Sequence, residues 1–152
     1  MMENAHFQEM IRVCRNHAEK KKEHDAKKRQ IIQKYGFESK ELSDWYDEFE
    51  AMVFPYSSGE MKAFWAWRNS QEFSLDFIEM EDHLWENEVA DFVKTLKQAG
   101  IGGFVFSNRS TGLMENIHQL IAEGCTLVGP SSFVKKTKWD EERPVIGLEF
   151  RI

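Results

Sequence analysis

The chain has 152 residues, a formal net charge of -6 and a composition that is 41% hydrophobic and 13% aromatic. This is enough apolar material for one core of ordinary domain size, and only three prolines and nine glycines argue against a mainly disordered chain. No apolar run is long enough for a membrane span or a signal peptide, and the two cysteines lie far apart. We therefore expect a cytoplasmic protein with no membrane partner.

Charge is distributed unevenly along the sequence. Residues 1–35 carry nine basic and five acidic side chains, a balance of about +4, whereas residues 36–91 carry fifteen acidic and three basic ones, about -12. The acidic segment repels phosphate, and a single basic helix offers few phosphate contacts. Direct binding of nucleic acid is therefore not expected.

The first third of the chain predicts two helices. Residues 4–34 form one long helix in this prediction, because apolar residues recur at helical spacing and no glycine occurs before Gly36. Ser39 is a suitable N-cap for a second helix over 40–52, which has a narrow apolar face. The domain organisation that follows is a charged N-terminal helix, residues 1–35, and a single α/β domain, residues 36–152.

The next segment is open to two interpretations. Ser57 and Glu60 have the spacing of a capping box, which favours a short helix, whereas the dense aromatics of residues 61–67 favour a strand. We predict the strand, paired with a second one over 72–80, where apolar and polar residues alternate.

The second half predicts alternating helices and strands. Asp82 is expected to cap a helix over 83–98 that stops at Gly100, and Ser110 to begin another. The predicted elements after Gly100 are a buried strand near 103–107, a helix from Ser110 to Gly124, and strands near 125–136 and 144–152. This order predicts an α+β (mixed α/β) fold, with a mixed sheet and helices packed on it.

The part from Phe73 to Ile152 resembles the second half of a GNAT-type acyltransferase, in which a strand, a helix, a strand ending near an Asn, and a further helix precede two final strands. The resemblance implies an acyl-CoA pyrophosphate at the helix after Asp82. That family binds the pyrophosphate with a glycine-rich turn at a helix N-terminus. Residues 80–88 contain no glycine and four carboxylates. We therefore predict no cofactor. The alternative function is that of a GNAT-like protein that binds a small ligand or acyl-CoA, which includes a degenerate acyltransferase.

Two small constellations have both a functional and a structural interpretation. The loop between a strand and a helix could hold an anion through Asn108, Arg109, Ser110 and Thr111, although Ser110 is equally explained as an N-cap. Cys14 and His17 have ligand spacing on the first helix, but zinc needs further ligands that the spacing does not supply. We predict no metal site, and no pattern of catalytic residues is complete.

Aromatic and acidic residues are dense between residues 44 and 81. Aromatic rings supply buried area at protein interfaces, and carboxylates steer a basic partner. The expected partner-binding residues, with two basic residues of the first helix as a second contact, are Asp44, Trp45, Asp47, Glu48, Trp65, Trp67, Glu79, Glu81, Lys21 and Lys28.

Three sequence runs, Asp44-Trp-Tyr-Asp-Glu, Met52-Val-Phe-Pro-Tyr-Ser-Ser-Gly-Glu and Phe64-Trp-Ala-Trp-Arg-Asn-Ser, resemble an uncharacterised family of small bacterial proteins, as does Met114-Glu-Asn-Ile-His. Its members look like accessory proteins of mobile elements, which implies an inhibitor or adaptor of host machinery, such as an anti-CRISPR protein. The leading hypothesis is a non-enzymatic protein that binds a basic, nucleic-acid-handling host protein, for example a CRISPR effector.

Overall fold

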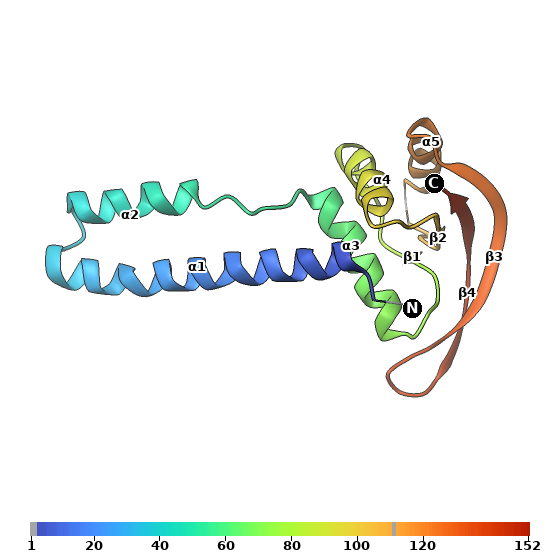
Figure 1. The fold of residues 1–152 in the computed structure, drawn as a ribbon, viewed down its shortest axis with the longest axis horizontal. Helices are drawn as coiled ribbons and strands as arrows, with labels where there is room; N and C mark the ends of the chain where they lie inside the picture. The colour runs from blue at the N-terminus through green and yellow to red at the C-terminus, as the bar shows by residue number, and fades with distance from the viewer. Residues whose placement is uncertain (1–2, 111) are drawn as a thin grey trace. The chain divides into compact units, whose positions relative to one another are not determined.

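The computed structural model describes residues 3–110 and 112–152 (Figure 1). The chain divides into two compact units, Met1–Gln8 with Tyr56–Ile152 and Glu9–Pro55. Its elements, in chain order, are α1 (Ala5–Tyr35), α2 (Lys40–Ala51), α3 (Ser58–Glu72), β1 (Glu79–Met80), the short 3-10 helix η1 (Glu86–Glu88), α4 (Val89–Gln98), β2 (Gly103–Phe106), α5 (Leu113–Ala122), β3 (Thr126–Lys136) and β4 (Glu142–Arg151). The predicted α+β class, with a long N-terminal helix and a mixed sheet, is confirmed.

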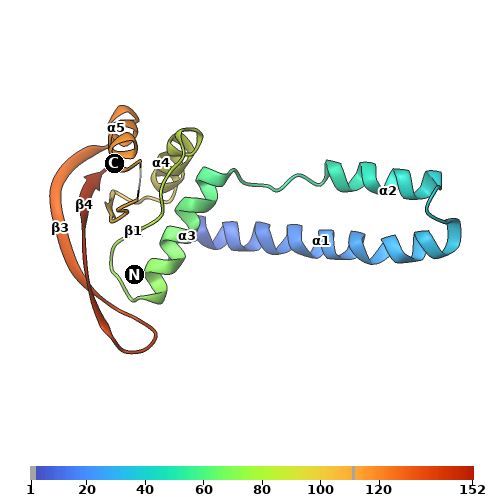
Figure 2. The same ribbon diagram turned by 180° about the vertical axis from the view of Figure 1, so that it is seen from behind.

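The unit Glu9–Pro55 is a helical hairpin, in which α2 runs back alongside α1 (Figures 1 and 2). Gly36 ends α1 with a φ of +87°, a backbone conformation that favours glycine. The Ser39 hydroxyl accepts a hydrogen bond from the Leu42 N–H at 3.1 Å, which confirms the predicted N-cap. α1 is long but largely polar, and no helix in the described part of the chain has the length and apolar character to cross a membrane.

One reciprocal contact fixes the two helices of the hairpin against each other. The rings of His24 and Trp45 stack 4.5 Å apart, with only 8° between their planes. The Trp45 indole N–H donates to the His24 carbonyl at 2.7 Å, and the His24 Nε2 lies 2.9 Å from the Trp45 carbonyl oxygen. Because both residues are buried, the contact holds the register of α2 on α1.

The other unit is built on a four-stranded sheet with the strand order β1-β2-β4-β3. β1 and β2 are parallel, whereas β4 is antiparallel to both β2 and β3. The chain order β1-α4-β2-α5-β3-β4 is the one that the acyltransferase resemblance implied. β2 has four residues and β4 has ten, so β4 extends past the end of β2 while remaining paired with β3.

The core of this unit lies against one face of the sheet. Phe92 of α4 meets Phe104 of β2 edge to face at 5.4 Å, and Phe104 stacks on Phe150 of β4, also at 5.4 Å. Side chains alternate between faces along a strand, so Phe106 and Leu148 share this face, whereas Val105 lies on the opposite one. The opposite face also carries Glu79, the β1 residue that is paired with Val105.

The strand predicted for residues 61–67 is wrong, because these residues form the middle of α3. Ser57 and Glu60 form the complete capping box, with the Glu60 N–H bonded to the Ser57 hydroxyl at 3.2 Å and the Ser57 N–H to the Glu60 carboxylate at 3.1 Å. The aromatic residues pack at helical spacing, since Phe64 and Trp67 are both buried. The local capping box, and not the aromatic density, therefore indicates the secondary structure of this segment.

Two further boundaries differ from the prediction. Only Glu79–Met80 of the segment 72–80 is a strand, and Ser74 has a φ of +55°, which interrupts extended structure. The helix expected over 83–98 starts late, with η1 at Glu86–Glu88 and α4 at Val89. Its first residues stay extended because the Asn116 amide bonds both the backbone N–H and the carbonyl of Leu84. Asp82 therefore caps no helix.

Candidate ligand-binding site at the end of strand β2

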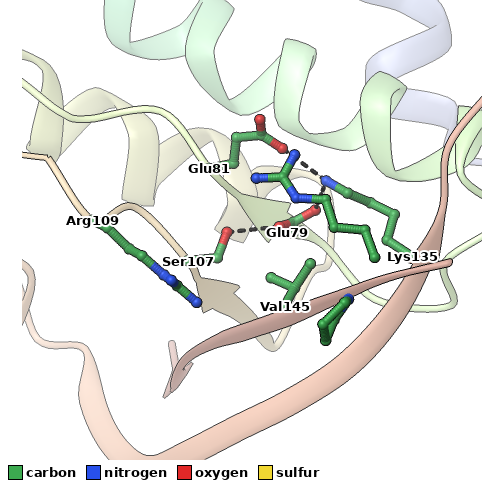
Figure 3. Close-up of a pocket in the computed structure, with 8 residues that line it drawn as sticks. Glu79, Glu81, Ser107, Arg109, Lys135 and Val145 are labelled. Atoms are coloured by element: carbon green, nitrogen blue, oxygen red, sulfur yellow. Dashed lines mark hydrogen bonds and ion pairs between the residues drawn. The ribbon is translucent and has the colours of Figure 1, made fainter. Parts of the chain in front are cut away.

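A buried lysine lies between two carboxylates on the polar face of the sheet. The Lys135 ammonium is 2.7 Å from a Glu79 carboxylate oxygen and 2.8 Å from a Glu81 oxygen. The other oxygen of Glu79 accepts a hydrogen bond from the Ser107 hydroxyl at 2.7 Å. Figure 3 shows these four side chains converging from β1, β3 and the end of β2. Lys135 and Glu79 are both buried, so they form a pair shielded from solvent.

The cluster keeps the lysine charged. Burial by itself lowers the pKa of Lys135, but the hydrogen bonds and negative charges of Glu79 and Glu81 outweigh it and raise the pKa above its usual value. The ammonium also lies 4.6 Å from the centre of the Phe73 ring, a favourable cation–π distance. These contacts therefore favour the ammonium form of Lys135.

This cluster forms one wall of a cavity of about 270 Å³ (Figure 3). Residues 143–145 of β4 also line the cavity, as does Arg109, which follows the end of β2. Among the residues that the structure describes, none forms an ion pair with the Arg109 or Arg143 guanidinium group. The cavity therefore offers two cationic groups that are not neutralised.

The register of the sheet explains why carboxylates are needed at this place. Lys135 of β3 and Arg143 of β4 are directly opposite each other in the ladder, and like charges in that position repel. The carboxylates of Glu79 and Glu81, both in the wall of the cavity, offset the repulsion. Two carboxylates facing three cationic side chains leave a positive balance at the cavity.

A second cavity, of about 660 Å³, is lined by residues 146–148 of β4, next to the residues of β4 that line the polar cavity. Its walls are mainly apolar and include Phe106, Leu113, Ile146 and Leu148. Phe106 and Leu148 belong to the sheet face that bears the core, so this apolar cavity and the polar one open on opposite faces. Arg109 lines both.

The site falls inside a recognised sequence family. Residues 62–152 match the family described as Domain of unknown function (DUF7698). The chain belongs to this family. No curated protein and no solved structure matches the chain. Both cavities and the whole ion cluster lie within the DUF7698 region, whereas the helical hairpin lies outside it, so the cavities are the features that belong to the family domain.

The four residues predicted to hold an anion are only partly brought together. Arg109 lines the polar cavity. Asn108 is buried, and its side-chain Oδ1 accepts a hydrogen bond from the Ser110 N–H at 2.6 Å. Ser110 is not the N-cap of α5, because that position is Gly112, with a φ of +92°. The predicted role of Thr111 lies outside the described residues.

The predicted partner-binding residues separate into buried and exposed groups. Trp45 and Trp67 belong to the core, and Glu79 is occupied by Lys135, so none of the three offers its side chain to a partner. Trp65 is 49% exposed. The acidic residues of α2, namely Asp44, Asp47 and Glu48, and also Glu81, are exposed.

The two basic residues predicted as a second contact act within the hairpin. The Lys28 ammonium lies 5.0 Å from the Trp45 ring centre and 4.9 Å from that of Tyr46, and Lys21 lies 5.3 Å from Phe49. Both lysines therefore cover aromatic rings of α2.

The predicted absence of a metal site concerns Cys14 and His17 of α1. Burial raises the pKa of the Cys14 thiol, which disfavours the thiolate that binds metal. Among the described residues no group of three His, Cys, Asp or Glu side chains is close enough to hold a metal ion.

Sequence reasoning missed Lys135, Ser107 and Arg143, which form the site together with Glu79. A signal for Lys135 exists, because it follows Phe133 by two residues and so points to the same face of β3 as an inward aromatic residue. A lysine at an inward strand position requires a carboxylate partner. The identity of that partner, 56 residues away, is not a local property of the sequence.

Proposed function

We propose that the DUF7698 domain of this protein binds a small anion, a carboxylate or a phosphate ester, in the polar cavity at the end of β2. The observation that supports the proposal is the pair of guanidinium groups, Arg109 and Arg143, that line the cavity without an ion-pair partner among the described residues. Guanidinium groups bind carboxylate and phosphate through paired N–H donors.

The other polar groups of the cavity would set the orientation of the ligand. The Ser107 hydroxyl donates its hydrogen to Glu79, so its oxygen can only accept a further hydrogen bond. Glu79 and Glu81 repel a second anionic group on their side. The cavity is therefore suited to a ligand with its anion near the arginines and an N–H or O–H donor near Ser107.

The direct test is to titrate the full chain with acetate and with inorganic phosphate and to monitor binding by the NMR shifts of its backbone amides. We expect saturable shifts at Ser107, Arg109 and Arg143 with one of the two anions, and a loss of affinity of about tenfold in Arg143→Met, because one charge-assisted contact is removed. Arg151→Met, at an exposed position of the same strand that does not line the cavity, is the matched control. Equal weakening by both substitutions, or no saturable shift, would reject the proposal.

A second candidate function is the docking of a basic, nucleic-acid-handling protein on the hairpin. It is favoured by α2, whose buried residues Leu42 and Trp45 pack inward while Asp44, Asp47 and Glu48 are exposed. The acidic residues are held on a helix that the His24–Trp45 contact fixes in register. Such a surface would increase the association rate with a basic partner.

Charge reversal tests this second candidate. The triple substitution of Asp44, Asp47 and Glu48 to Lys should abolish capture of basic proteins at low salt, because the steering field is inverted. A control with the same change in net charge reverses three exposed acidic residues elsewhere, Glu123, Asp140 and Glu141. Equal loss in both variants would show that only net charge matters, and tight binding of naked DNA by the unaltered chain would instead make it a nucleic-acid-binding module.

A further inference from the structure

We infer that the natural ligand of this site is an extended peptide segment of another protein, which pairs with the free edge of β4 and places alternate acidic and apolar side chains in the two cavities. The inference rests on the proposed anion site and specifies what carries the anion.

β4 has a stretch of unpaired edge inside the sheet. The β2–β4 ladder ends at the pair Phe106 and Leu148, whereas β4 continues back to Glu142 with β3 on one side only. The two cavities lie along this stretch, since residues 143–145 line the polar one and residues 146–148 the apolar one. The edge is therefore open to a ligand along both cavities.

The hydrogen-bonding groups on this edge follow from the alternation of the ladder. The Ile152 N–H donates to the Gly102 carbonyl at 2.9 Å, which shows that even-numbered residues of β4 direct their backbone groups toward β2. Ile146 has the same parity and no β2 residue opposite it. Its N–H and carbonyl are thus the donor and acceptor that a new strand would use.

The position of proline agrees with this assignment. Pro144 has the same parity as Ile146, so its missing N–H removes no hydrogen bond to β3. Pro130 of β3 likewise has the parity that faces away from β4, because it is paired with Leu148. Prolines are tolerated in a sheet where the strand edge is free, so both positions agree with the alternation of the ladder. Pro144 leaves its carbonyl, but no N–H, for a new strand.

A peptide on this edge would send successive side chains to opposite faces of the sheet. One set would enter the polar cavity, where Arg109 and Arg143 favour a carboxylate, and the other set would enter the apolar cavity between Phe106, Ile146 and Leu148. The Ser107 oxygen, which can only accept, matches a backbone or side-chain donor of the peptide. Backbone pairing with pockets for alternate side chains is a general mode of peptide recognition.

The outer edge of β3 lacks these features. It is interrupted by an irregularity between Leu127 and Gly129, and its exposed Lys136 discourages pairing with another strand. The two guanidinium groups that line the polar cavity come from β4 and from the segment after β2, whereas β3 contributes only Lys135 to it. The occupant is therefore assigned to the inner edge of β4, and not to β3.

The probe is the peptide Leu-Glu-Leu-Glu-Leu-amide with a fluorophore joined to its N-terminal nitrogen through an amide bond. It is titrated with the full chain and followed by fluorescence anisotropy. We expect saturable binding, at least tenfold weaker binding of the analogue with Lys in place of Glu, and an amide NMR shift at Ile146. Ile146→Pro removes the edge donor without removing a bond to β3, and should weaken binding about threefold to tenfold, whereas Ile146→Val should not. Circular dichroism and the melting temperature report whether the proline variant is folded.

A change in the ligand removes any dependence on folding of the variant. Methylation of the peptide nitrogen at the two Glu residues, or instead at the central Leu, blocks one edge of the peptide strand at a time, so only one of these two peptides should lose affinity. Equal affinity of the two methylated peptides, or of the Glu and Lys peptides, would overturn the inference. If acetate or phosphate still binds with dependence on Arg143 in that case, the anion site survives and only its peptide occupant is rejected.

Discussion

Lys135→Met is expected to lower the free energy of unfolding by about 3–5 kcal/mol, because it leaves the buried Glu79 carboxylate without its cation. Methionine has nearly the length of the lysine stem, so the loss reports the missing charge more than missing volume. Urea denaturation at neutral pH measures the change. Lys136→Met, at the exposed neighbouring position of the same strand, should change stability by no more than about 0.5 kcal/mol.

The double variant Lys135→Met with Glu79→Gln should recover much of the loss, since no uncompensated charge then remains.

The contribution of Lys135 to stability also depends on pH. Because the folded-state pKa of Lys135 is raised above its usual value, its contribution to stability is present below about pH 10.5 and is lost as the pH rises through the folded pKa. A stability difference between wild type and Lys135→Met that vanishes near neutral pH would contradict the buried pair.

Phe7→Ala, as a separate single variant, is expected to lower the free energy of unfolding by about 3–5 kcal/mol, the usual loss for a buried aromatic side chain. Phe7 is fully buried, stacks on Trp67 with ring centres 5.0 Å apart, and lies 6.3 Å from Phe64. It belongs to the unit with Tyr56–Ile152, although the family match begins only at residue 62. The change is measured from the urea unfolding transition of the unit that contains the sheet.

The same substitution at an exposed phenylalanine is the control for Phe7→Ala. Phe37 is 78% exposed, so Phe37→Ala should change stability by about 0.5 kcal/mol or less. If Phe7→Ala were equally mild, the first turn of α1 would not be part of the core of the family domain.

Elements with local signals were predicted well from sequence. Gly36 and Ser39 mark the end of α1 and the start of α2 with their own backbone and hydroxyl groups, and the structure has both features. The buried strand near Phe104 and the two final strands also follow from nearby residues, as β2, β3 and β4 show. In each case the determining interaction lies within a few residues.

Elements fixed by distant residues were not predictable in the same way. Leu84 stays out of a helix because Asn116, 32 residues later, bonds its backbone. The polar cavity depends on the contact of Lys135 with Glu79 and on the length of β2, which has only four residues. The sequence identified Arg109 through the chemistry of its loop, but Glu79 was assigned to partner binding, because a pairing across the sheet is not a local property of the sequence.

The position of β4 in the sheet has a consequence for the synthesis of the chain. β4 lies between β2 and β3, yet it is the last strand to be made, and Asn4 near the start bonds the Ala99 carbonyl 95 residues later. Strand β2 is therefore made before its antiparallel neighbour, and its apolar residues stay without that neighbour until β4 has been made. We expect the DUF7698 domain to fold only after β4 has been made, so a chain stopped before Glu142 should be captured by chaperones.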